Sequence, residues 1–169
     1  QLLLPLSAVI LTGCIGEIII RNVNVDEKSF YLPMRDGTKI AVSVFLPPKM
    51  EKNRSFPAII EGTRYWRAIE YMDSKAAKKC PKLLMAKWTV MQDFAYITFD
   101  VRGTGASFGF WNGILSSTEV EDYKEIIRWV ASQPWCNGRI GLWGNSYDGA
   151  LAMRAAASKH PAVKAVSVR

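Results

Sequence analysis

A serine in a glycine-rich turn is the residue of this sequence best suited to nucleophilic chemistry. Residues 144–149, with the sequence GNSYDG, join a predicted strand to a predicted helix, so Ser146 stands at a sharp strand-to-helix turn. The two small glycines permit a strained backbone and a close approach of the helix, which is the logic of a nucleophile elbow. The helix N-terminus and the backbone amide of Tyr147 would stabilise a developing oxyanion. The second glycine falls one residue later than in G-x-S-x-G, so a serine that merely caps the helix is an equal alternative from this motif alone.

A second glycine-rich loop, residues 103–109, follows a predicted strand. A dinucleotide-binding loop has the spacing G-x-G-x-x-G and opens directly into a helix. Here the third glycine comes one residue late, and residues 111–113 continue the loop instead of starting a helix. The cysteines Cys80 and Cys136 also lack the spacing of a zinc site. We therefore expect no cofactor and no metal.

The first 16 residues carry no charge, and their apolar run ends in small residues before Cys14. This length suits the apolar core of a secretory signal better than a membrane-spanning helix, which needs about 20 residues. Residues 11–14, with the sequence LTGC, resemble a bacterial lipoprotein processing site, where cleavage precedes a cysteine whose thiol is lipidated. The alternative is a buried strand with an incidental cysteine. The basic residues and the methionine that precede such a signal are missing, so we expect the natural chain to begin earlier.

These features predict an exported protein. Residues 1–13 are expected to be the remnant of a lipoprotein signal peptide, and residues 14–29 a mature N-terminal segment. Lipidation at Cys14 would anchor the protein to a bacterial membrane, in the periplasm or at the cell surface. Export would also allow Cys80 and Cys136 to pair in a disulfide.

The composition is that of one soluble globular domain. The 169 residues are 49% hydrophobic and 22% charged, which excludes disordered and collagen-like chains. The net charge of +7 is concentrated in residues 64–87, which hold seven basic and two acidic residues. Their lysines are irregularly spaced and are not interleaved with aromatic residues, so we expect a solvated surface and no nucleic-acid partner. Attraction to an anionic membrane surface is a secondary alternative.

Strand and helix signals alternate from residue 30 onward. The pair Asp36-Gly37 between two apolar stretches predicts an opening hairpin. The clearest helix is expected over residues 118–132, where Thr118 and Glu121 would form a capping box. The alternation predicts an α/β fold with a mostly parallel sheet. Further strands are expected over residues 30–33, 39–46, 57–61, 94–101, 139–144 and 163–168, and helices over 147–159 and over parts of 69–92, with a break at Pro81.

Three motifs occur in order along these elements. They are MRDG at residues 34–37, DVRGTGAS at residues 100–107, and residues 133–149, where QPW and NG precede GNSYDG. In this order they resemble the cocaine esterase-like and X-prolyl dipeptidyl peptidase family of serine hydrolases, from about residue 32 to residue 169. The resemblance implies an α/β-hydrolase fold in which Ser146 attacks an ester or amide carbonyl and forms an acyl-enzyme.

The resemblance also implies two donors for an oxyanion hole. They are the backbone amide of Tyr147 and the hydroxyl of Tyr65, in the loop after the third strand. A phenol is a neutral donor that can be aimed at a developing negative charge. Gly62 and Arg64 stand where the family often shows the Arg and Pro of an Arg-x-Pro-Tyr run. The alternative is that Tyr65 is a surface aromatic residue on a basic loop.

Other conspicuous side chains are expected to have structural roles. Asp100 and Arg102 would brace the loop after their strand, and Asp148 would offset the dipole of the helix that follows. Three tryptophans could line an acyl pocket or simply pack, namely Trp66, Trp111 and Trp143.

A serine nucleophile needs a base and an acid, which in this fold follow it in the order acid, histidine. His160 is the only histidine in the sequence. It lies 14 residues after Ser146, about 20 Å away along a helix that rises 1.5 Å per residue, which is too far for it to be the base. We therefore expect residues 30–169 to be the N-terminal part of a hydrolase domain, inactive alone, whose triad acid and base, cap and C-terminal β domain lie beyond this sequence.

Two functions are compatible with the sequence. The first is a lipid-anchored serine hydrolase for small-molecule ester or amide substrates or peptides. Within it, ester, β-lactam acyl amide and X-Pro peptide substrates remain open. The second is a non-catalytic lipoprotein that uses the same fold for binding.

Overall fold

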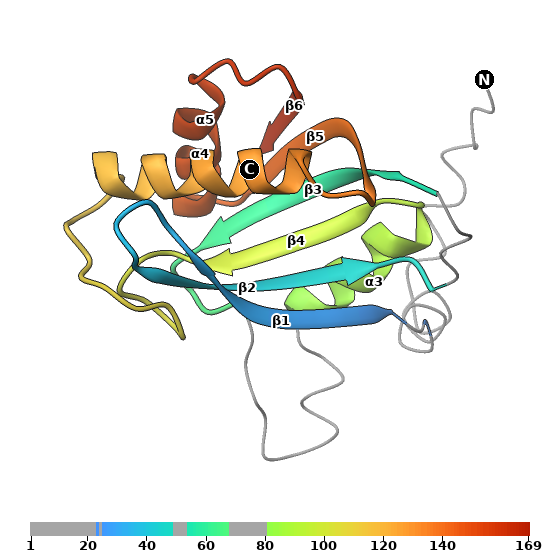
Figure 1. Cartoon of the computed structure of the whole chain (residues 1–169), viewed down its shortest axis with the longest axis horizontal. Helices are drawn as coiled ribbons and strands as arrows, with labels where there is room; N and C mark the ends of the chain where they lie inside the picture. Colours follow the sequence, from blue (N-terminus) through green and yellow to red (C-terminus); the bar gives the residue numbers. More distant parts are fainter. Residues whose placement is uncertain (1–22, 24, 49–53, 68–80) are drawn as a thin grey trace, which may run out of the picture.

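A mixed six-stranded sheet forms the centre of the computed structural model, which describes residues 23, 25–48, 54–67 and 81–169 (Figure 1). The strand order is β1-β2-β4-β3-β5-β6. β1 with β2 and β2 with β4 are antiparallel, whereas β4 with β3, β3 with β5 and β5 with β6 are parallel. The elements are β1 (Asp26–Pro33), β2 (Lys39–Leu46), β3 (Phe56–Thr63), α3 (Pro81–Met91), β4 (Ala95–Asp100), α4 (Ser117–Ala131), β5 (Cys136–Gly144), α5 (Tyr147–Ala156) and β6 (Val163–Val168).

The opening hairpin has the turn that the Asp-Gly pair predicts. Gly37 adopts a positive φ of 80°, which favours glycine, and its amide donates a hydrogen bond to the Met34 carbonyl at 2.8 Å. β1 begins at Asp26, four residues before the expected start, so the expected domain boundary at residue 30 falls inside this strand. The first four residues of β1 are exposed, and they therefore lack the apolar alternation that would reveal a strand in the sequence.

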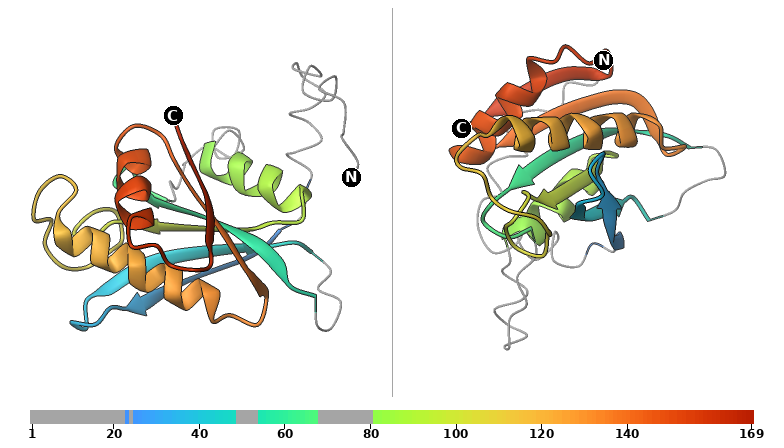
Figure 2. Two further views of the ribbon diagram at one scale, coloured as in Figure 1. Left: turned by 90° about the horizontal axis from the view of Figure 1, so that it is seen from above. Right: turned by 60° about the vertical axis from the view of Figure 1, so that its left-hand side comes forward.

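The helices divide between the two faces of the sheet (Figure 2). α4 and α5 pack on one face, against β3, β5 and β6, whereas α3 packs on the other, against β2 and β4. Neighbouring side chains accordingly enter different cores: Ile97 belongs to the core under α4 and α5, and Tyr96 to the core under α3. All six residues of β4 are buried, as the uniformly apolar strand predicted.

The cap of α4 lies two residues earlier than expected. Ser116, not Thr118, is the N-cap: its side chain accepts from the Glu119 amide at 3.3 Å, and the Glu119 carboxylate accepts from the Ser116 amide at 2.8 Å. Glu121 instead accepts from Lys124 at 2.6 Å on the surface. The predicted capping box is therefore wrong in register. An apolar stripe at helical spacing along this helix is buried, at Val120, Tyr123, Ile127 and Val130.

The other boundaries follow the prediction with small shifts. α3 begins at Pro81, where the break is expected, since a proline in the first turn needs no backbone donor. β5 starts at Cys136, three residues early, and α5 ends at Ala156, three residues early. The expected helical parts before residue 81 lie outside the described residues, as do residues 1–22. Among the described helices, none is long and apolar enough to cross a bilayer.

Candidate active site

Ser146 occupies a strained turn between β5 and α5. Its backbone has φ 54° and ψ −120°, a combination that L-residues rarely adopt and that concentrates at functional sites. The turn is held by the Ser146 amide, which donates to the Arg169 carbonyl at 2.7 Å. Ser146 is exposed, and although it is the N-cap of α5, its side chain makes no capping hydrogen bond. The alternative of a capping serine therefore lacks the contact that defines it.

Two glycines make this turn possible. A Cβ on Gly144 would lie 2.3 Å from the carbonyl carbon of Asp148, and one on Gly149 would lie 2.8 Å from the Gly144 oxygen. Gly144 thus lies against the backbone of residues 148 and 149, and Gly149 lies against the backbone of Gly144. Neither position accepts a side chain. The spacing of one residue beyond G-x-S-x-G keeps the close strand–helix contact that a nucleophile elbow needs.

The Tyr147 amide is available to a ligand. It is the first residue of α5, and amides in the first turn of a helix have no partner within the helix. No described residue accepts a hydrogen bond from it. The amide therefore has the properties of an oxyanion donor beside Ser146, at the positive end of a helix.

The side chain of Tyr147 is anchored by a buried carboxylate. Its hydroxyl donates to Glu119 Oε1 at 2.7 Å, and the same oxygen accepts from Trp111 Nε1 at 2.9 Å. Glu119 is 2% exposed. Burial, and then the bond to Glu119, raises the pKa of Tyr147, so its hydroxyl stays protonated and donates. The side chain of Tyr147, the residue after Ser146, is thereby fixed to the start of α4. Glu119 was not among the expected site residues; its signal in the sequence is the motif S-x-x-E at residues 116–119.

Tyr65 lies next to Tyr147. It follows β3, the parallel neighbour of β5, and its ring meets the Tyr147 ring edge-on with centroids 6.4 Å apart. The residue is 54% exposed, and its hydroxyl makes no hydrogen bond to a described residue. The structure thus brings together the two residues that were expected to form the oxyanion hole. The role of the Tyr65 hydroxyl remains a prediction.

Asp100 holds the loop that carries Tyr65. Its carboxylate accepts from the Arg67 amide at 2.7 Å and from the Ala106 amide at 3.0 Å. A Cβ on Gly105 would lie 2.4 Å from the carboxyl carbon of Asp100, which explains a glycine at that position. The carboxylate therefore ties the loop after β3 to the loop after β4, in agreement with the expected bracing role.

Arg102 connects the loop after β4 to α4 and to the opening hairpin. It is 6% exposed and donates from Nε and Nη2 to both carboxylate oxygens of Asp122, at 2.7 Å each. It also bonds Asp36 in the hairpin turn at 2.5 Å and holds the pKa of that carboxyl well below its usual range. The Asp36 and Arg102 motifs are therefore structural, and the expected bracing role of Arg102 is confirmed.

The remaining candidates, apart from Asp148, lie away from Ser146 or outside the described residues. Asp148 lies in the first turn of α5, as expected, but it is buried. Cys136 is a free, half-buried thiol, and burial raises its pKa. Cys14 and Cys80 lie outside the described residues. His160 precedes β6, whereas Ser146 follows its parallel neighbour β5, so the two residues belong to opposite ends of the sheet.

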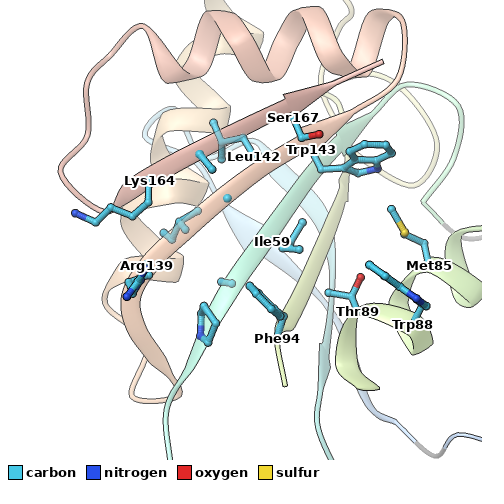
Figure 3. Close-up of a pocket in the computed structure, with 15 residues that line it drawn as sticks. Ile59, Met85, Trp88, Thr89, Phe94, Arg139, Leu142, Trp143, Lys164 and Ser167 are labelled. Carbon is cyan, nitrogen blue, oxygen red and sulfur yellow. The ribbon is translucent and has the colours of Figure 1, made fainter. Parts of the chain in front are cut away.

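An apolar groove of about 560 Å³ lies on the face of the sheet that carries α3 (Figure 3). It runs over β3, β5 and β6 beside α3, with Trp88, Phe94 and Trp143 among its lining. None of residues 61–67 or 144–149 lines it. This groove is therefore separate from the Ser146 site, and Trp143 belongs to it. Trp66 and Trp111, at 59% and 40% exposed, lie in the loops after β3 and β4.

Comparison with known proteins agrees with this geometry. A family model described as X-Pro dipeptidyl-peptidase (S15 family) matches residues 36–168. A Mycobacterium bovis protein that bears the name of a serine esterase is 36% identical over 151 residues, which is 82% of this chain and 23% of that protein. The cocaine esterase of a Rhodococcus species is 26% identical over 136 residues, which is 80% of this chain and 22% of that protein.

A solved structure supports the fold in the same way. The crystal structure of a CocE/NonD family hydrolase from Staphylococcus aureus matches with a TM-score of 0.70 and 27% identity, over 84% of this chain and 27% of that one. The chain thus spans about a quarter of the length of these three relatives. The family match covers most of the sequence and includes the elbow at Ser146, so the chain belongs to the S15 family of X-Pro dipeptidyl-peptidases and related esterases, which are serine hydrolases with an α/β-hydrolase fold.

Proposed function

We propose that Ser146 is the nucleophile of a serine hydrolase that forms an acyl-enzyme. The observation that carries the proposal is the strained left-handed backbone of an exposed serine whose hydroxyl is not used as a cap. Strain of this kind persists only where the surrounding structure enforces it, as Gly144 and Gly149 do here. A protein that only bound a ligand would have no need of it, so the described residues do not favour the non-catalytic alternative.

The proposed reaction begins with attack of Ser146 Oγ on the carbonyl carbon of the substrate. The negative charge that develops on the carbonyl oxygen is stabilised by the Tyr147 amide and the Tyr65 hydroxyl. The tetrahedral intermediate then collapses, expels the leaving group and leaves an ester on Ser146, which water hydrolyses. A base must take the Ser146 proton, and His160 lies at the wrong end of the sheet. We propose that the triad acid and base come from parts of the whole protein outside this sequence.

An ester is the substrate class that the relatives favour. The relative at 36% identity and the cocaine esterase are both named as esterases, whereas a relative named as an Xaa-Pro dipeptidyl-peptidase is 22% identical. The test is hydrolysis by the whole protein of 4-nitrophenyl butyrate, of an acylamino β-lactam and of Ala-Pro-4-nitroanilide. We expect the highest kcat/KM for the ester. A higher value for Ala-Pro-4-nitroanilide would assign a peptidase instead, and hydrolysis of none of the three would contradict the proposal.

We also propose that the protein is held at a bacterial membrane through a lipid on Cys14. The support is the sequence of residues 11–14 after an uncharged apolar run. When the whole protein is expressed in bacteria, we expect it in the membrane fraction with a mass that includes the lipid. Cys14→Ser should remain unprocessed or become released, whereas Cys80→Ser serves as a matched control. Identical fractionation and processing of Cys14→Ser and the parent would contradict the anchor.

A further inference from the structure

An arginine is held among three aromatic rings at the edge of the candidate site. The Arg64 guanidinium carbon lies 4.7 Å from the ring centroid of Trp111, 5.1 Å from that of Tyr147 and 5.8 Å from that of Tyr65. These rings come from the loop after β4, the start of α5 and the loop after β3. Attraction between a cation and ring faces, repeated on three rings, fixes where the positive charge stands.

This charge has no anionic partner among the described residues. The other arginines near it in the fold, Arg67 and Arg102, have carboxylate oxygens of Asp100 and Asp122 within 4 Å. Arg64 is half-buried, yet it forms no ion pair and no hydrogen bond with any described residue. A guanidinium has five N–H donors in a fixed fork that matches a carboxylate. A partly desolvated guanidinium whose donors no described residue uses is suited to receive an anionic group from a ligand.

The position of Arg64 relates it to the reacting atoms. It directly precedes Tyr65, and its guanidinium contacts the ring of Tyr147, the residue after Ser146. A substrate whose carbonyl lies between Ser146 and Tyr65 would present its nearby substituents to this charge.

We propose that Arg64 determines specificity, and that the site prefers esters that carry a carboxylate near the scissile carbonyl. The inference rests on the proposed function at Ser146. The chemistry of recognition is a charge-assisted hydrogen bond, which is worth about 10- to 100-fold in affinity when it is formed away from bulk water. The carboxylate can belong to the acyl part or to the leaving group, and the substrates of the test distinguish these two.

The test compares matched charged and neutral esters with the whole protein. For the acyl part, mono-4-nitrophenyl adipate is compared with 4-nitrophenyl hexanoate. For the leaving group, 4-carboxyphenyl hexanoate is compared with 4-carbamoylphenyl hexanoate. We expect kcat/KM to be about 10-fold or more higher for the charged ester of at least one pair. The preference should decrease as salt is raised, because ions screen the attraction.

Variants of Arg64 separate recognition from a structural role. Arg64→Met keeps an apolar stem against the rings and should remove the preference while it leaves kcat/KM for neutral esters within a few-fold. Arg64→Lys should retain part of the preference. Arg54→Met is the matched control, because Arg54 also contacts a ring, that of Phe56 at 5.0 Å, but lies before β3 and pairs with Asp93. This control should behave as the parent does.

The outcomes are decisive for the inference. If the parent shows no preference in either pair, or if Arg64→Met lowers charged and neutral esters equally, Arg64 is a structural clamp and the inference is wrong. In both of these cases Ser146-dependent hydrolysis of neutral esters would persist, so the proposed function would stand. If no ester were hydrolysed in a Ser146-dependent manner, the proposed function itself would fail, and the inference with it.

Discussion

Replacing Ser146 by alanine in the whole protein should reduce kcat for ester hydrolysis by about 10⁶-fold, because removal of the nucleophilic serine from a serine protease has an effect of this size. The hydroxyl is exposed at the strained turn after β5 and makes no capping bond, so its removal costs no helix cap. Folding of the variant should therefore remain close to that of the parent, as measured by circular dichroism and melting temperature.

His160→Ala is the matched control for this variant. His160 lies before β6, and its Nδ1 accepts a hydrogen bond from the Ala162 amide at 3.2 Å, which is a local structural contact. Its kcat should stay within a few-fold of the parent. A folded Ser146→Ala protein that retained most of its ester hydrolysis would remove Ser146 from the mechanism. A large loss of kcat in a folded His160→Ala protein would show that the base had been assigned wrongly.

Tyr65→Phe should lower kcat by about 10²- to 10³-fold, which is the effect of removing one oxyanion donor elsewhere. The hydroxyl makes no hydrogen bond to a described residue, so we expect the loss to appear in kcat and not in stability. Steady-state kinetics with 4-nitrophenyl butyrate provide the measurement.

Tyr147→Phe is the variant with which Tyr65→Phe is compared. The Tyr147 hydroxyl donates to Glu119, so it is not the group that we expect to stabilise the oxyanion. The backbone amide, which we expect to do so, is unchanged by the substitution. We expect a smaller fall in kcat and a lower melting temperature, because a buried hydrogen bond is lost. Equal and small effects of Tyr65→Phe and Tyr147→Phe on kcat would count against Tyr65 as a donor.

Much of the fold could be predicted because the strands differ so clearly from the helices in sequence. β4 is buried along its whole length and is almost uniformly apolar, whereas α4 carries an apolar stripe at helical spacing. The start of α4 was missed because two overlapping S/T-x-x-E motifs occur here, one that begins at Ser116 and one that begins at Thr118. What distinguishes them is a tertiary effect: Glu119 must also accept from Trp111 and Tyr147.

The site was predicted only where a local motif carries it. Ser146 could be found because six consecutive residues, 144–149, form the whole strand-to-helix turn. The bond between Glu119 and Tyr147, and the ring cluster around Arg64, join residues that are far apart in the sequence. Only the neighbouring positions of β3, β4 and β5 in the sheet bring them together, so periodicity and spacing could not reveal them.

The most direct test of Ser146 as nucleophile is to find the covalent bond that it forms. The whole protein is treated with a fluorophosphonate, and the modified peptide is identified by mass spectrometry in the parent, in Ser146→Ala and in His160→Ala. We expect one adduct per chain on Ser146 in the parent and in His160→Ala, and no adduct in Ser146→Ala, since only a serine activated by a base attacks such a reagent. Stoichiometric labelling of the parent at any other residue, or undiminished labelling of Ser146→Ala, would contradict the assignment.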